Sequence, residues 1–289
     1  MTRFKNIIHT VDLHCAGEPT RVVLSGFPDL LGATMASRKR EMTEHHDHLR
    51  ALLMSEPRGH ADMYGAVLTP PVTPASDAGL VFLDNGGYLD MCGHATICAA
   101  VAMVETGRTT GPQVRFDTPT GPVNCRLVPG ETGPDIVRLE NAPAFVTETG
   151  VPLDVPGLGR IKLDVAFGGN FFALVPAQEI GLKLTPGNAT ELSRLGLDIR
   201  DRLNTRLQVR HHELPDINHV ALTMFYEPIP STDGALRTVA VFGSGQIDRS
   251  PCGTGTSALM ALMHDRGDLE VGTDLKFHSI INTCFTGSI

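Results

Sequence analysis

The sequence has 289 residues, of which 42% are hydrophobic and 19% charged, a balance that excludes an intrinsically disordered chain. The formal net charge of −8 argues against a nucleic-acid partner, because such a surface would show clustered Lys and Arg. The longest apolar run, residues 95–104, has about half the length that a bilayer-spanning helix needs, so we expect no membrane association. The N-terminal residues lack the apolar core of a signal peptide. We therefore expect a cytoplasmic protein with reduced cysteines.

The first half of the chain predicts strands around one buried helix. Short apolar runs separated by polar residues in 6–26 predict an opening pair of strands. Residues 40–54 predict a helix that ends before Pro57. The run 95–104 is apolar on nearly every side, which is typical of a helix buried on all sides. Further strand-like segments lie at 66–68 and 79–83.

The second half follows the same outline. Strand-like segments run from about 113 to 174, and residues 188–208 predict one amphipathic helix. Two more strand-like segments, 220–225 and 238–242, precede a glycine-rich turn. A second helix is expected over 257–265.

The two halves match at a shift of 160 positions. Cys92-Gly93-His94-Ala95-Thr96 then falls on Cys252-Gly253-Thr254-Gly255-Thr256. Phe82 falls on Phe242, and the helix-ending Gly107 falls on Gly267. A unit of strand, glycine turn, Cys-Gly-x-x-Thr and buried helix therefore occurs twice, which indicates an internal duplication.

A cysteine at the N-terminus of a helix is a candidate acid, base or nucleophile. The helix dipole and the first-turn N–H groups favour the thiolate, and the same N–H groups suit a substrate carboxylate. Two such units, holding Cys92 and Cys252, predict a two-base inversion of a stereocentre, in which one thiolate removes an α-proton and the other thiol returns one. Asp248 is placed to pair with an ammonium group, and His94 to assist with the substrate nitrogen or carboxylate.

These residues carry a resemblance to the proline racemase family, which extends from Ile8 to the last residue. The matching segments are Met91-Cys92-Gly93-His94, Asp248-Arg249-Ser250-Pro251-Cys252-Gly253-Thr254-Gly255-Thr256, Glu56-Pro57-Arg58-Gly59-His60-Ala61-Asp62-Met63-Tyr64-Gly65 and Phe167-Gly168-Gly169-Asn170-Phe171-Phe172. The resemblance implies the α+β fold of diaminopimelate epimerase, with two pseudo-symmetric lobes, each a curved, mostly antiparallel sheet around a central buried helix. We expect the first lobe at 1–118, with 279–289 returning to it, the second at 119–278, and the active site in the cleft between them.

The resemblance also implies an isomerase that works without pyridoxal phosphate, any other cofactor or a metal. Cys92 and Cys252 match the family's acid–base pair, while Asp248 and His94 match positions that contact the substrate nitrogen. The remaining matched positions form a carboxylate cradle, from the amides of Gly93, His94, Gly253 and Thr254, and a ring pocket, walled by Tyr64 and Phe242.

Within the family the sequence favours proline as the substrate. Epimerases of 4-hydroxyproline tend to carry smaller residues at Tyr64 and Phe242 and a polar residue, often His, at Leu222. The hydroxyl of Tyr64, where racemases commonly have Phe, keeps 3- or 4-hydroxyproline as an alternative. A trans-3-hydroxy-L-proline dehydratase on the same scaffold is a further alternative, although dehydratases usually lack one of the two cysteines.

Other classes of protein fit the sequence less well than an isomerase does. An anion-binding or thiol-redox protein would favour cysteines close in sequence, whereas these two lie in separate repeats. The run His45-His46-Asp47-His48 is expected on a solvated surface rather than in a metal site. Family members usually continue beyond the segment matching 285–289 with strands that return to the first lobe. We expect surface left uncovered there to be buried in a homodimer.

Overall fold

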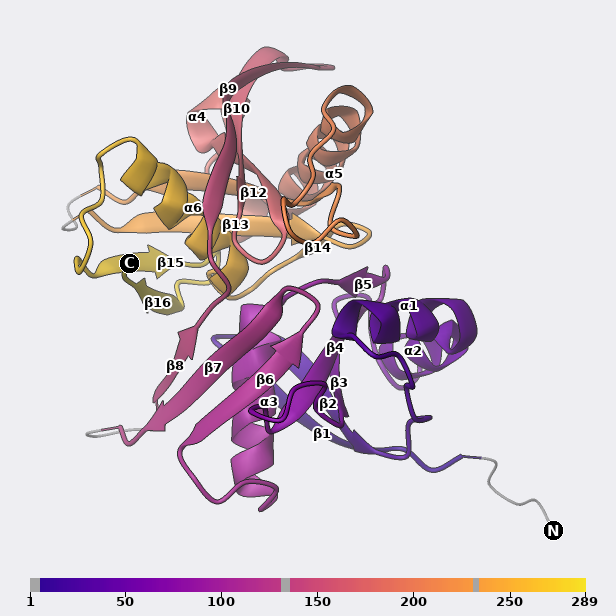
Figure 1. Ribbon diagram of the computed structural model, residues 1–289. Helices are drawn as coiled ribbons and strands as arrows, with labels where there is room; N and C mark the ends of the chain where they lie inside the picture. Colours follow the sequence, from indigo (N-terminus) through magenta and orange to yellow (C-terminus); the bar gives the residue numbers. More distant parts are fainter. Residues whose placement is uncertain (1–5, 131–135, 231–233) are drawn as a thin grey trace. The chain divides into compact units, whose positions relative to one another are not determined.

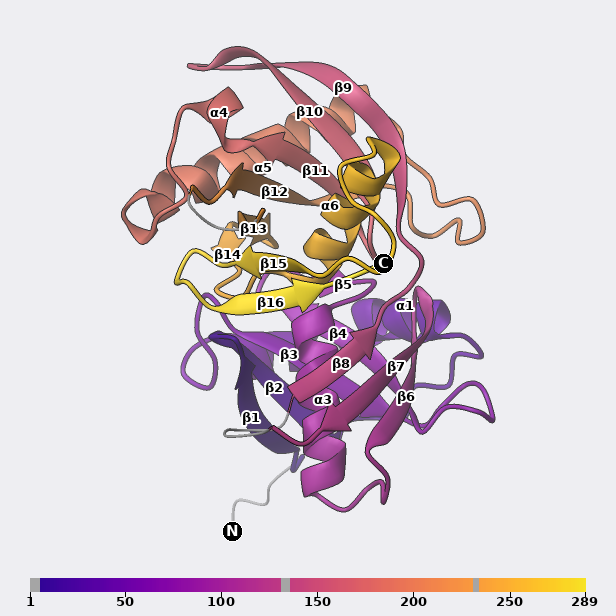
Figure 2. The same cartoon turned by 90° about the vertical axis from the view of Figure 1, so that its left-hand side faces the viewer.

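The computed structural model describes residues 6–130, 136–230 and 234–289 (Figure 1). The chain divides into two compact units, unit 1 with Met1–Cys15 and Pro19–Ala142, and unit 2 with Ala16–Glu18 and Pro143–Ile289. Each unit is an α+β structure in which one curled sheet surrounds one central helix (Figures 1 and 2). This confirms the expected epimerase-like fold. Within the described ranges, no helix is both long enough and apolar enough to cross a bilayer.

Unit 1 contains a sheet with the strand order β1-β2-β3-β4-β6-β7-β8, and β5 pairs with β4. The central helix α3 contacts strands from both ends of this sheet, β1 and β8, as well as β3 and β7. Helices α1 and α2 connect β2 to β3 and pack on β4. The elements are β1 (His9–Cys15), β2 (Glu18–Ser25), α1 (Met35–His45), α2 (Asp47–Met54), β3 (Tyr64–Thr69), β4 (Ala78–Asp84), β5 (Tyr88–Leu89), α3 (Gly93–Glu105), β6 (Gln113–Thr118), β7 (Gly121–Val128) and β8 (Ile136–Glu140).

Unit 2 contains a sheet with the strand order β9-β10-β11-β12-β13-β15-β16, and β14 pairs with β13. Its central helix α6 contacts β9, β10, β11 and β16. Helix α5 lies in the connection from β11 to β12 and packs on the sheet through a cluster of buried apolar residues. The elements are β9 (Phe145–Val155), β10 (Gly159–Phe167), β11 (Phe171–Pro176), α4 (Ala177–Ile180), a 3-10 turn (Pro186–Asn188), α5 (Ala189–Arg206), β12 (Val220–Pro228), β13 (Leu236–Phe242), β14 (Gln246–Ile247), α6 (Gly253–Asp265), β15 (Leu275–His278) and β16 (Cys284–Gly287).

The internal repeat seen in the sequence is a repeat of topology. In unit 1 the pair β2–β3 is parallel, β3–β4 antiparallel and β4–β6 parallel. In unit 2 the pair β11–β12 is parallel, β12–β13 antiparallel and β13–β15 parallel. Helices α3 and α6 both have 13 residues. Each follows a β-hairpin in the chain, β4–β5 or β13–β14, and precedes the strand that pairs in parallel with the first strand of that hairpin.

The division between the units differs from the expected boundary at 118/119. Strands β6 and β7 pair along their length on either side of that point, from Gln113↔Arg126 to Thr118↔Gly121, and β8 continues the same sheet. Apart from Ala16–Glu18, the chain passes to unit 2 at Ala142/Pro143. The segment 279–289 contains β16, which pairs with β15 in the sheet of unit 2. Strand pairing, which local sequence patterns do not encode, therefore sets the division.

Candidate active site

Cys92 is the N-cap residue of helix α3, directly before its first residue, Gly93. It has an extended backbone (φ −145°, ψ 118°), and its carbonyl oxygen accepts hydrogen bonds from the amide of Thr96 at 3.1 Å and from the hydroxyl of Thr96 at 2.6 Å. The side chain of Cys92 does not cap the helix; its Sγ atom lies 3.1 Å from Nδ1 of His94. The N-terminus of α3 therefore combines a thiol and an imidazole, which can exchange protons, with first-turn amide donors, which can bind an anion.

His94 lies in the first turn of α3 and is buried. Burial lowers the pKa of His94 to about 3, so the imidazole is neutral at physiological pH. Its ring meets the ring of Tyr64 edge to face, with centroids 4.7 Å apart. A neutral imidazole has one donor and one acceptor nitrogen, so the Nδ1 atom accepts from a Cys92 thiol or, in the other tautomer, donates to a thiolate. His94 therefore suits either protonation state of its neighbour.

Cys252 holds the corresponding position at the start of α6, but with a different backbone. Its φ of 66° lies in the left-handed region, which is strained for a residue with a side chain. The preceding loop holds this conformation: the hydroxyl of Ser250 accepts from the Cys252 amide at 3.1 Å, and the Ser250 amide donates to Asp248 at 2.8 Å. Thr238 on β13 donates to the carbonyl oxygen of Pro251 at 3.0 Å. Backbone strain held in place by its surroundings is common at active sites.

Asp248 and Cys252 form a buried acidic pair. Burial raises the pKa of Asp248 to about 6, although the hydrogen bonds from Ser250 oppose this shift. Burial, followed by the charge of Asp248, raises the pKa of Cys252 well above its ordinary value, against the opposing effect of the Gly255 amide and the Thr254 hydroxyl. At Cys252, burial and the neighbouring carboxylate therefore oppose the effect of the helix N-terminus and favour the thiol over the thiolate.

The structure brings the other expected site residues of each unit towards its cysteine. Gly93 is the first residue of α3, and Gly253 and Thr254 are the first two of α6. The Thr254 hydroxyl lies 3.8 Å from the Cys252 sulfur. Tyr64, at the start of β3, contacts His94 as described above.

Leu222 and Phe242 lie on the face of the unit 2 sheet that is opposite α5. Their neighbours Thr223 and Val241 both contact Gly196 of α5, and side chains alternate along a strand. Helix α6 lies on the opposite face, because its Gly255 packs against the side chain of Met224. Thr223 pairs with Val241 in the antiparallel pair of β12 and β13. Leu222, near the start of β12, and Phe242, at the end of β13, therefore lie next to that pair on the same side of it. Both side chains are buried.

Sequence reasoning did not assign roles to Ser250 and Gly168. Ser250 connects Asp248 to the Cys252 amide, and the signal for it was the Asp-x-Ser spacing, which is typical of a side-chain-stabilised turn. Gly168 lies in the turn between β10 and β11, where a Cβ atom would be 2.2 Å from the Thr254 carbonyl oxygen. Glycine is needed there so that the turn can approach the first turn of α6.

Among the residues that the structure describes, no group of three or more His, Cys, Asp or Glu side chains is arranged to hold a metal ion. None of the six cysteines, all of which lie in the described ranges, forms a disulfide. Burial raises the pKa of Cys98 to about 11 and that of Cys125 to about 12. These two thiols are therefore protonated packing residues.

The duplicated fold and the cysteines at the start of equivalent helices define a two-lobed, epimerase-like α+β protein. A model of the proline racemase family matches residues 10–289, and the chain belongs to that family. It is 41% identical to a proline racemase from Clostridioides difficile over 291 aligned residues, which cover 99% of this chain and 87% of the relative.

Two further relatives are hydroxyproline epimerases. A 4-hydroxyproline 2-epimerase from Cereibacter sphaeroides is 38% identical over 97% of this chain and 85% of its own length. The crystal structure of a hydroxyproline epimerase from Agrobacterium vitis with bound trans-4-hydroxy-L-proline superposes with a TM-score of 0.92 at 34% identity, covering 99% of this chain and 84% of that one. All three relatives are isomerases, so the expectation of an isomerase is confirmed at the level of the family.

Proposed function

We propose that the protein is a cofactor-independent racemase that inverts the α carbon of proline, with Cys92 and Cys252 as its acid–base pair. The observation that carries this proposal is the equivalence of the two cysteines. Each begins a 13-residue central helix, and each has polar side chains of its own unit around the sulfur. A reaction that removes a proton on one face of a carbon and adds one on the other needs two such groups.

The proton balance of the proposed reaction is simple. One cysteine, as thiolate, takes the α-proton and becomes a thiol, and the electron pair stays on the α carbon next to the carboxylate. The other cysteine, as thiol, gives its proton to the opposite face and becomes a thiolate. The substrate composition is unchanged, and the enzyme is left with its two protonation states exchanged. The raised pKa of Cys252 makes it a proton donor at the start of one direction of the reaction.

The surroundings of the cysteines suit the two charges of an amino acid. We propose that the first-turn amides of Gly93 and His94, with those of Gly253 and Thr254, bind the carboxylate, because helix N-termini favour anions. We also propose that Asp248, assisted by His94, binds the substrate nitrogen. An ammonium group beside Asp248 would offset the charge that now raises the pKa of Cys252, and so would ease formation of the thiolate.

Proline is the proposed substrate because Leu222 and Phe242 are buried apolar side chains on the α6 face of the unit 2 sheet. An apolar wall has no partner for a ring hydroxyl. 4-Hydroxyproline is the second candidate, supported by the epimerase relatives and by the Tyr64 hydroxyl. Dehydration of trans-3-hydroxy-L-proline is a weaker alternative, because the chain has both cysteines. We keep the expectation of a cytoplasmic homodimer, and sedimentation velocity tests the dimer.

One panel of substrates tests the function. The purified protein is incubated with L-proline, D-proline, trans-4-hydroxy-L-proline and trans-3-hydroxy-L-proline. Optical rotation and chiral chromatography follow inversion, and imine formation reports dehydration. We expect both proline enantiomers to reach a racemic mixture without added cofactor. Faster inversion of 4-hydroxyproline would make the protein an epimerase of that substrate, and no inversion of any of the four would refute the proposal.

A further inference from the structure

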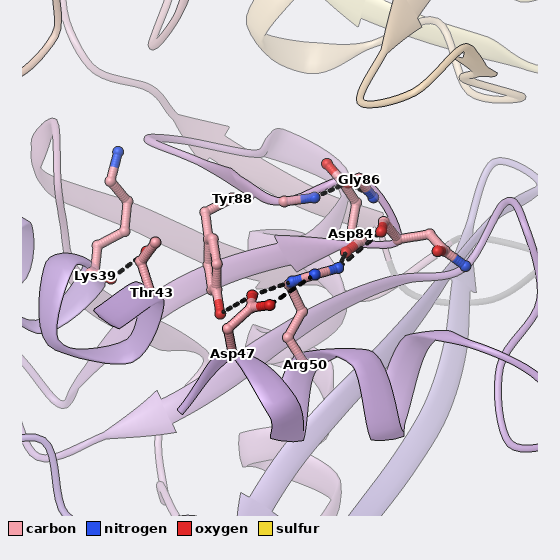
Figure 3. Close-up of polar contacts among 9 residues, drawn as sticks. Lys39, Thr43, Asp47, Arg50, Asp84, Gly86 and Tyr88 are labelled. Carbon is pink, nitrogen blue, oxygen red and sulfur yellow. Dashed lines mark hydrogen bonds and ion pairs between the residues drawn. The ribbon is translucent and has the colours of Figure 1, made fainter. Parts of the chain in front are cut away.

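The segment that leads into Cys92 is tied to helix α2 by several hydrogen bonds, and Arg50 makes two of them. Strands β4 and β5 form a tight hairpin, and only Asp90 and Met91 separate β5 from Cys92. Arg50 on α2 donates through Nη1 to the carbonyl oxygen of Asp84, the last residue of β4, at 3.0 Å (Figure 3). The same atom donates to the carbonyl oxygen of Asn85, in the hairpin turn, at 2.7 Å. The arginine thus bridges the connection between β2 and β3 to the turn that precedes the cysteine.

Further side chains strengthen this tie. Asp47 accepts two hydrogen bonds from Arg50, at 2.6 and 3.1 Å, and a third from the Tyr88 hydroxyl at 3.0 Å (Figure 3). The guanidinium of Arg50 also lies 5.7 Å from the centre of the Tyr88 ring. Closer to the cysteine, Lys39 of α1 pairs with the buried carboxylate of Asp90. Residues of β5 and of the segment after it are therefore held by the helices of the connection.

Unit 2 repeats this arrangement with different residues. Arg200 on α5 donates through Nη1 to the carbonyl oxygen of Gly243 at 2.7 Å, in the turn between β13 and β14. Like Arg50, it also binds an aspartate through Nε, here Asp201 at 2.8 Å. Ser193, also on α5, donates to the carbonyl oxygen of Gly245 at 2.5 Å. The turn held in this way leads through β14 to the loop that ends at Cys252.

We propose that Arg50 and Arg200 are positioning residues, each of which fixes the hairpin that carries the chain into the cysteine of its own unit. Hairpins of two-residue strands have little stability of their own, so contacts outside the hairpin decide where its ends lie. Arginine suits this task because its planar donors hold a carboxylate and backbone carbonyls at the same time, which lysine does not. The effect of this role on catalysis rests on the proposed function. The effect on where the two thiols lie is independent of it.

Site-resolved alkylation tests the inference. The substrate-free protein is treated with iodoacetamide, and mass spectrometry of the peptides gives separate initial rates for Cys92 and Cys252. Both sulfurs are buried, so loosening one hairpin should expose one of them. We expect Arg50→Lys to raise the rate at Cys92 roughly 2- to 10-fold, the value of one or more lost hydrogen bonds, and to leave Cys252 unchanged. Arg200→Lys should show the reverse pattern.

The control is Arg194→Lys, which changes an exposed arginine of α5 that pairs with Glu191. This variant should leave both rates at the parent values. If Arg50→Lys fails to fold, Tyr88→Phe removes only the hydroxyl bond to Asp47 and should give a smaller rise at Cys92 alone. Equal changes at both cysteines, or no change at either, would overturn the inference.

Kinetics with the substrate found in the panel gives a second readout. A displaced thiol should lower kcat of Arg50→Lys by roughly 10-fold or more, with a much smaller change in KM. If Arg50→Lys and the control Arg194→Lys had the same kcat, the positioning role of Arg50 would be contradicted. The alkylation rates need no substrate. If the parent protein is inactive on every substrate of the panel but the variants show the expected labelling pattern, the proposed function is refuted and the positioning role is still supported.

Discussion

The sulfur atom of Cys92 lies 3.1 Å from Nδ1 of His94. In unit 2 the residue equivalent to His94 is Thr254, whose hydroxyl lies 3.8 Å from the sulfur of Cys252, and a carboxylate, Asp248, provides the ionisable neighbour. The duplicated helix starts therefore carry different acid–base surroundings. One thiol has a neutral imidazole beside it and the other a carboxylate, and this difference makes the two units separately testable.

The first prediction concerns the need for both cysteines. Cys92→Ser and Cys252→Ser each replace a thiol with a hydroxyl of much higher pKa, so each should lower kcat by roughly 10²- to 10⁴-fold. Polarimetry with L-proline measures the loss. Cys284→Ser is the control, because Cys284 is exposed on β16 and should be replaceable at no cost. Racemisation by Cys252→Ser at the parent rate would rule out the two-base mechanism.

The buried helices were predictable because their apolar character is a local property. The predicted runs 95–104 and 257–265 lie within α3 and α6. Helix α6 begins at Gly253, four residues before the predicted start. The prediction began too late because the first turn contains Gly253 and Gly255, and glycine has low helix propensity. Each cysteine is therefore the N-cap residue of its helix, at the helix N-terminus, as predicted from the sequence.

Other features depend on contacts that no local pattern reports. The predicted helix over 40–54 is two helices, α1 and α2, which meet at His46. The raised pKa of Cys252 follows from burial of the sulfur and from the nearby Asp248, and neither can be read from the spacing of the two residues. The proposed role of Arg50 depends on its hydrogen bonds to two backbone carbonyl oxygens more than 30 positions away.

The second prediction is that Asp248 destabilises the folded protein above pH 6. Its pKa of about 6 in the folded state exceeds the ordinary value of 3.8, so its favourable contribution is complete below about pH 4 and is lost as the pH rises through 6. Asp248→Asn has no such charge. The parent should therefore lose roughly 2–3 kcal/mol of stability relative to Asp248→Asn between pH 4 and 7. Urea unfolding at several pH values measures this, and a constant difference would contradict burial of the charge.

The third prediction has the opposite sign and concerns His94. Its pKa of about 3 in the folded state lies below the ordinary value of 6.5, so the contribution of neutral His94 is present above pH 6.5 and is lost as the pH falls. Relative to His94→Gln, the parent should lose roughly 2–4 kcal/mol between pH 7 and 4. Because the Asp248 effect runs the other way over this interval, the parent curve alone shows only the difference, and both variants are needed. Parallel unfolding curves for parent and His94→Gln would show that His94 titrates normally.

The fourth prediction concerns ring specificity. A hydroxyl left without a partner against Leu222 and Phe242 costs roughly 1–3 kcal/mol, so the parent should prefer proline to trans-4-hydroxyproline by about 5- to 150-fold in kcat/KM. Leu222→His supplies a partner and should narrow this ratio, whereas Leu222→Met keeps the wall apolar and serves as the matched control. A parent that prefers 4-hydroxyproline would show that these residues do not form the wall of the ring site.

The last prediction tests the approach of the β10–β11 turn to the start of α6. A Cβ atom on Gly168 would lie 2.2 Å from the Thr254 carbonyl oxygen and 2.6 Å from the Ala258 amide nitrogen, and neither backbone atom can move without moving the helix. Gly168→Ala should therefore cost roughly 1–3 kcal/mol of stability, the usual cost of overpacking, and should lower kcat by displacing the helix that Cys252 begins. Gly187→Ala is the control, because a Cβ atom there meets no atom within 4 Å. Thermal unfolding and proline turnover are measured on both variants. If Gly168→Ala matched Gly187→Ala in both measurements, the close approach at Thr254 would have no part in holding the start of α6.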